Sequence, residues 1–172
     1  MRKALIPVMV LFLLVMGVFT AAAVNETGNN SSVNNTSTPR GGVVQPLSLW
    51  SSVTVEPSTI SLGTVPPDGI ERSYPDAVTA TVNYIIAGGD TLSVRASGNL
   101  VNTANSSLTI PLSNFKFSTP SLSKRPFTTS NQVIMTYSGF IGSSSVPLSL
   151  YITVPTYTDP GTYSTTLIYT ST

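Results

Sequence analysis

The stretch Val146–Val154, which reads VPLSLYITV, carries the pattern that decides the fold. Apolar residues occupy every second position, and the residues between them are Pro147, Ser149, Tyr151 and Thr153. A period of two is the period of a β-strand that buries one face and exposes the other. The stretch therefore predicts a half-buried strand.

The same alternation recurs along the chain from Val43 onward. The other apolar sets lie in Leu47–Val55, Ile60–Leu62, Val78–Ile86, Leu92–Ala96, Leu108–Leu112, Val133–Tyr137 and Tyr163–Tyr169. No window of twelve residues here has helical apolar spacing free of Gly, Pro or β-branched interruptions, so we expect no helix. About eight short strands divided by turn residues predict an all-β fold, a single antiparallel β-sandwich of immunoglobulin-like or jelly-roll type.

The composition excludes several classes of chemistry. The chain has no His and no Cys, so it lacks an imidazole base, a thiolate nucleophile, a disulfide and a thiolate metal site. Charged residues make up 9% of the chain, and Lys+Arg 8 nearly balance Asp+Glu 7, so there is no basic patch for nucleic acid. We expect no enzyme, no cofactor and no nucleic-acid partner.

The N-terminus has the three parts of a secretory signal peptide. Arg2 and Lys3 precede an apolar run from Ala4 to Phe19, and small residues follow at 21–23. We expect cleavage after Ala23, so that residues 1–23 are removed. The alternative is a retained membrane anchor, because the 20 residues from Ala4 to Ala23 at ~1.5 Å each would cross a core of ~30 Å. Both readings place the rest outside the cell or on its surface, with a membrane partner only if the segment is kept.

Residues 24–42 predict a disordered linker, because the stretch Asn25–Arg40 contains a single aliphatic residue, Val33. The β-domain is expected over residues 43–172. Acceptor sequons for N-glycosylation occur at Asn25, Asn29, Asn30, Asn34, Asn35 and Asn105. Five sequons close together in an exported linker favour glycosylation, although a linker rich in Asn, Ser and Thr also produces sequons by chance.

Three of the seven carboxylates lie in one segment, at Asp68, Glu71 and Asp76. Asp68 and Glu71 could form the acid/base pair of a glycosidase, and all three could supply oxygen ligands to calcium. Pro67-Asp68-Gly69 is also a turn signal, in which proline fixes φ and glycine accepts positive φ. We favour the turn, since the segment lacks the alternating ligands of a metal-binding loop.

The segment Asp159–Tyr163 resembles the tyrosine corner of immunoglobulin-like sandwiches. In that motif a tyrosine after a turn folds its ring inward and hydrogen-bonds to backbone. Asp159, Gly161 and Tyr163 occupy the matching positions, without the second Cys of antibody domains. We expect these three residues to form a structural corner.

The aromatic residues could serve either in core packing or in binding a glycan. Trp50 lies among aliphatic residues and is expected in the core. Tyr74, Tyr151 and Tyr157 could form a carbohydrate-binding platform, but an exposed tyrosine on a strand is more often a cross-strand packing residue, which we favour. Lys124 and Arg125 are expected in a solvated loop.

The signal peptide and Ser/Thr-rich β-domain accompany two short segments, Leu62-Gly63-Thr64-Val65 and Pro160-Gly161-Thr162-Tyr163. Together they resemble secreted prokaryotic β-sandwich surface proteins, including jelly-roll subunits of archaeal bundling pili and bacterial biofilm fibres. The resemblance implies assembly by lending an N-terminal strand to a neighbour. In this chain, however, the sequon-rich linker precedes the first strand.

The expected first strand, Val43–Val55, contains Pro46 and therefore belongs at a sheet edge. No charge protects it before Glu56, so it could be lent to a second copy or paired within its own domain. The sequence favours a structural or adhesive protein of the cell surface, such as a filament subunit joined by strand exchange. The alternative is a module that binds surface polysaccharide.

Overall fold

The computed structural model describes residues 10–14 and 50–172, and the fold is all-β, as the alternation predicted. In the described part of the chain, eleven strands are joined by turns, and the single helical element is a 3₁₀ turn, η1 (Leu112–Asn114). The expected linker, residues 43–49 and most of the expected signal peptide lie outside the described residues.

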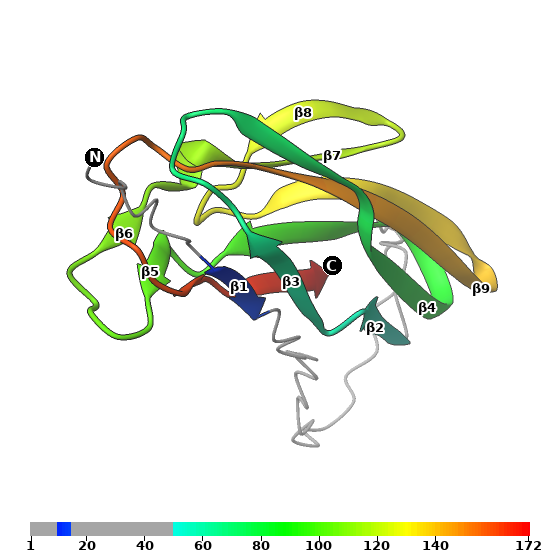
Figure 1. Cartoon of the computed structure of the whole chain (residues 1–172). Helices are drawn as coiled ribbons and strands as arrows, with labels where there is room; N and C mark the ends of the chain where they lie inside the picture. Colours follow the sequence, from blue (N-terminus) through cyan, green and yellow to red (C-terminus); the bar gives the residue numbers. More distant parts are fainter. Residues whose placement is uncertain (1–9, 15–49) are drawn as a thin grey trace, which may run out of the picture.

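Figure 1 shows the strands folded over one another around a common interior. Their bounds are β1 (Val10–Leu14), β2 (Trp50–Glu56), β3 (Thr59–Thr64), β4 (Glu71–Ala96), β5 (Leu100–Asn102), β6 (Thr109–Ile110), β7 (Phe115–Thr119), β8 (Leu122–Pro126), β9 (Gln132–Thr153), β10 (Tyr163–Ser164) and β11 (Leu167–Ser171).

Two long strands, β4 and β9, form the framework of the fold. They pair antiparallel from Glu71↔Thr153 to Val94↔Gln132, although the sequence predicted two shorter strands in place of each. The expected break was wrong because both strands bend without leaving the ladder. We call residues 85–90 of β4 and 137–142 of β9 the bend; Figure 1 shows both strands turning back there. Gly89 and Gly139 have positive φ at this point, which glycine adopts without steric cost.

The strands belong to two hydrogen-bonded sheets. One has the order β3-β1-β10-β5-β6, and the other β11-β4-β9-β7-β8 with β2 added along β4. All pairs are antiparallel except β1 with β10. Among the described strands, β2 pairs only with β4, so it occupies the edge position that its sequence predicted.

The core is built from the predicted inward positions of these strands. The buried members include Val78, Ala80, Val82, Leu92, Val94, Ala96, Val146, Leu148, Leu150, Ile152 and Val154. The prediction for Val133–Tyr137 was partly wrong, because Val133 is exposed and Ile134 is buried. A register irregularity between Leu92 and Ser93 opposite this segment shifts the alternation by one residue.

Several short elements were not predicted or were shorter than expected. The expected strand Leu108–Leu112 is reduced to β6, since Pro111 is followed directly by η1. The missed strands β7 and β8 form a hairpin after it. Phe115 and Phe117 of β7 are fully buried against Phe127, with ring centroids 4.7 and 4.6 Å apart. This aromatic cluster closes one side of the core.

Candidate functional site

The first candidate site is the position of β1 within its sheet. Strand β1 lies between β3, which it pairs antiparallel from Val10↔Thr64 to Leu14↔Thr59, and β10, which it pairs in parallel at Leu11↔Tyr163. Its residues come from the apolar run that the sequence interprets as a signal peptide. A segment expected to direct export thus also completes a sheet.

Strand β3 depends on β1 for its place in this sheet. It is the terminal strand, and within the described residues its one pairing in the sheet is with β1. Its side chains Ile60 and Leu62 are buried in the core, and the Tyr74 hydroxyl donates to the Leu62 carbonyl at 2.8 Å. These contacts hold β3 against the core from one side. We call the strand-wide position between β3 and β10, which β1 fills, the slot.

The corner at the other neighbour of the slot has the predicted geometry. Tyr163, the first residue of β10, is almost wholly buried, and its hydroxyl donates to the Asp159 carbonyl at 2.9 Å. A Cβ at Gly161 would collide with the side-chain amide of Asn102. The Asn102 carboxamide oxygen accepts the backbone N–H groups of Ala104 and Asn105, which fixes it in place. The corner therefore anchors β10 as a rigid wall.

The acidic segment is a turn bound by ion pairs. Asp68 accepts the backbone N–H of Ile70 at 2.9 Å and pairs with Arg72 at 2.6 Å. The backbone N–H of Ile70 and then Arg72 lower the pKa of Asp68. Asp76 lies apart with a positive φ of 46°, its own N–H donating to Ser149. Among the described residues, no group of three His, Cys, Asp or Glu side chains could hold a metal ion.

Glu71 is engaged by two lysines from the β7–β8 hairpin. Lys116 contacts one carboxylate oxygen at 2.9 Å, and Lys124 contacts the other. Hydrogen bonds from Lys124 and then Lys116 lower the pKa of Glu71, so it remains ionised and is a poor proton donor. The expected solvated loop at Lys124 and Arg125 was wrong, because both residues belong to β8 and Lys124 is drawn to Glu71.

The three tyrosines of the possible glycan platform do not form one surface. Tyr74 packs against the core, and burial raises its pKa. Tyr151 lies beneath Lys124, whose Nζ is 4.8 Å from the ring centroid, and its hydroxyl is 3.1 Å from the Ser118 hydroxyl. Tyr157 is fully exposed in the loop after β9. Tyr151 is thus a packing residue on the outer face of the sheet.

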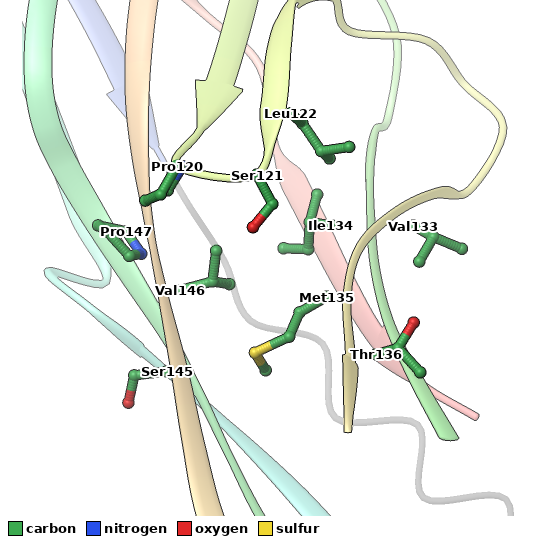
Figure 2. A pocket seen from close by; sticks show the side chains of 10 residues that line it. All are labelled: Pro120, Ser121, Leu122, Val133, Ile134, Met135, Thr136, Ser145, Val146 and Pro147. Carbon is green, nitrogen blue, oxygen red and sulfur yellow. The ribbon is translucent and has the colours of Figure 1, made fainter. Parts of the chain in front are cut away.

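One pocket, of about 380 Å³, lies beside the β7–β8 turn. Figure 2 shows the tip of this turn facing two separate parts of β9 across the pocket. The lining residues are Pro120, Ser121, Leu122, Val133, Ile134, Met135, Thr136, Ser145, Val146 and Pro147. None of these side chains is ionisable, so the pocket offers apolar contact and hydroxyls, with no acid or base.

The bend carries an apolar surface that the sequence did not predict. Trp50, expected in the core, is 53% exposed at the start of β2. It pairs across the sheet with Ile85, which pairs in turn with Ile141. Phe140 precedes Ile141 in β9, and these two side chains are 74% and 72% exposed. The prediction for Trp50 failed because local alternation does not reveal whether another strand covers a given face.

Of the six sequons, Asn105 alone lies within the described residues. It is exposed in the turn between β5 and β6, and its side-chain oxygen accepts the Ser107 N–H at 3.1 Å. The other five, at positions 25–35, lie outside the described residues. Asn105 is accessible to modification from the solvent side.

Comparisons with known proteins identify no family for this chain. No protein-family model matches the sequence, and a search of curated proteins gives no significant match. None of the helical structure in residues 10–14 and 50–172 is long and apolar enough to span a membrane. The slot, the corner and the bend are the structural features that bear on its function.

Proposed function

We propose that this protein is an exported structural protein of the cell surface whose copies join by strand exchange, with the slot between β3 and β10 as the acceptor. The observation that carries the proposal is the placement of β1. An apolar N-terminal strand lies inside a sheet, between two strands that have no direct pairing with each other. Such a position takes a strand from the same chain or from a neighbour with the same contacts.

Chain length makes exchange between copies geometrically simple. Strand β1 ends at Leu14 and β2 begins at Trp50, which leaves residues 15–49 between them. At roughly 3.3 Å per extended residue, this connection can span more than about 100 Å. The N-terminal segment of one copy could therefore occupy the slot of another without any change in either domain.

Removal of the N-terminal segment would create the need for a partner strand. Cleavage after Ala23 would take β1 away and leave the facing edges of β3 and β10 without their neighbour. Unpaired backbone groups at such edges favour pairing with another chain. Trp50–Glu56 is already paired with β4 in the same chain, so a donor in the cleaved form comes from residues before Trp50.

The corner supports this proposal because it keeps the slot's far wall in place. Tyr163 is both the register partner of Leu11 and the residue whose hydroxyl binds Asp159. An acceptor that is rigid before the strand arrives loses less conformational entropy on binding. The glycan-binding alternative lacks comparable support, since its three tyrosines do not share a surface.

The test compares the full chain with a form that begins at Val24. We expect the shorter form to assemble into fibres as its concentration rises, visible by negative-stain microscopy. A soluble peptide that carries residues 8–16 should fill the slot and keep the shorter form monomeric.

The matched control is the same peptide with Phe12→Pro, because proline cannot complete the pairing of an internal strand. This peptide should leave fibre formation unchanged. If the form beginning at Val24 is a folded monomer at every concentration, strand exchange is wrong and a tethered surface domain remains.

A further inference from the structure

The surface at the bend has the features of a membrane contact and does not depend on the slot. We call Trp50, Ile85, Phe140 and Ile141 the bend patch; Phe140 is next to Ile141 in β9, so it projects from the other face of the sheet at the same bend. Direct register partners on one face of a sheet have Cβ atoms about 5 Å apart, so Trp50, Ile85 and Ile141 form a row across β2, β4 and β9. Exposed runs of large apolar residues are rare on soluble domains unless they bind something.

The bend patch is held on a rigid support. Beneath it, Tyr84 lies 5.0 Å from Tyr137 between ring centroids, and its hydroxyl donates to the Ser138 carbonyl at 3.2 Å. Gly139 and Gly142 lie against the Tyr84 ring, where a Cβ at Gly142 would be 2.6 Å from the hydroxyl oxygen. The side chains of the patch are therefore presented outward by a packed turn and do not fold back onto the core.

Within the described residues, the bend carries no cation, and Asp90 at its end is the one carboxylate in it. Residues 50–55, residues 77–89 and all of β9 lack Asp, Glu, Lys and Arg. The described cations nearest in the β4–β9 ladder are Arg72 and Arg95, toward the ends of β4 away from the bend. Exposed hydroxyls at Ser138, Ser143 and Ser145 lie beside the patch. An uncharged apolar centre with a hydroxyl border suits the interfacial zone of a bilayer, where Trp and Phe are enriched.

One further observation selects a lipid surface over a second protein copy. Four partly exposed side chains supply at most a few hundred Å², whereas a stable protein interface needs about 800 Å² per partner. We propose that the bend patch inserts into the interfacial layer of a lipid membrane and orients the domain on it.

The protein contains its own probe for this contact, because Trp50 is its one tryptophan. Vesicles of neutral phosphatidylcholine should shift the Trp50 emission to shorter wavelength and sediment with the full-length protein. The absence of cations at the patch predicts that added salt does not weaken the binding.

The decisive comparison uses two double variants with the same N-terminal run. Phe140→Ser with Ile141→Ser should lower vesicle affinity about tenfold or more, because two large apolar side chains no longer leave water. Ile70→Ser with Val133→Ser removes apolar residues that are 58% and 48% exposed elsewhere, and should bind as the parent does. Circular dichroism identifies any variant that fails to fold, and Phe140→Leu, which keeps an apolar side chain, should retain binding.

Three outcomes would overturn the proposal. The first is the absence of any emission shift with vesicles. The second is an equal loss of affinity in both double variants. The third is an emission shift that depends on protein concentration without vesicles, which would assign the bend patch to contact between copies.

Discussion

The corner and the bend lie at opposite ends of the fold in Figure 1. The chain changes direction at both, but the residues that turn are packed differently. At the corner, the turning residues are tied to the interior: Tyr163 binds the Asp159 carbonyl, and Asn102 binds two backbone N–H groups. At the bend, Tyr84 supports the turn from inside, but Phe140 and Ile141 are left in solvent.

The buried tyrosine hydroxyls near the two ends also differ in whether they have a hydrogen-bond partner. The Tyr163 hydroxyl has a partner, whereas the buried hydroxyls of Tyr137 and Tyr169 have none in the described part of the chain. Burial desolvates the ionised form of Tyr169 and so raises its pKa. The corner thus satisfies its buried hydroxyl within the domain, whereas the bend leaves large apolar side chains in solvent.

The largest expected effect is the loss of the corner. Tyr163→Ala should lower the free energy of unfolding by about 3 kcal/mol or more, because it leaves a cavity among fully buried neighbours. Phe140→Ala at the bend should change it by less than about 0.5 kcal/mol, since the side chain is exposed. Urea denaturation measures both. Equal effects would break the comparison.

Alanine substitutions at the glycines of the corner and the bend should differ by a smaller amount in the free energy of unfolding that they cost. Gly161→Ala forces a Cβ into the held amide of Asn102, and we expect a loss of about 1–3 kcal/mol. Gly142→Ala places its Cβ 2.6 Å from the Tyr84 hydroxyl oxygen, farther than the Gly161 Cβ lies from Asn102, and Gly142 has no positive φ, so its loss should be smaller. Gly98→Ala is the control, because no atom lies within 4 Å of its Cβ position. Thermal and urea midpoints that rank Gly142→Ala below Gly161→Ala in stability would contradict this account.

Removing single hydroxyls gives a finer test. Tyr163→Phe should cost about 1 kcal/mol, because it removes one satisfied hydrogen bond. Tyr169→Phe should cost nothing or stabilise the fold, because it removes a buried hydroxyl that lacks a protein partner. The two variants are compared by urea midpoint at neutral pH. A similar loss in both would show that Tyr169 is hydrogen-bonded in solution.

The smallest expected effect concerns pH at the charged end of the β4–β9 ladder. Lys124 and Lys116 lower the folded-state pKa of Glu71, so its stabilisation is present above the unfolded pKa of about 4.3 and is lost as the pH falls through the folded value. The pairs are partly exposed, so the contribution is within about 1 kcal/mol. Glu71→Gln should flatten the fall of the urea midpoint in acid. An unchanged acid limb would show that these ion pairs add nothing.

The sequence by itself determined the local features of this protein. Alternation identified the inward residues of β4 and of the second half of β9, because side-chain direction in a strand has a fixed period of two. The order Asp159, Gly161, Tyr163 identified the corner, since its hydrogen bond joins residues four apart. Such contacts depend on neighbours in the chain and can be recognised from it.

Only the tertiary structure decided what depends on distant partners. It joined Val78–Ile86 to Leu92–Ala96 as one bent strand, because β9 pairs along both, and it placed β1 between β3 and β10. It brought Lys116 and Lys124 to Glu71 from a hairpin that the sequence did not reveal. It also left Trp50 exposed at an edge. Long-range pairing and register decide which apolar face is covered, and neither is written in the local period of the sequence.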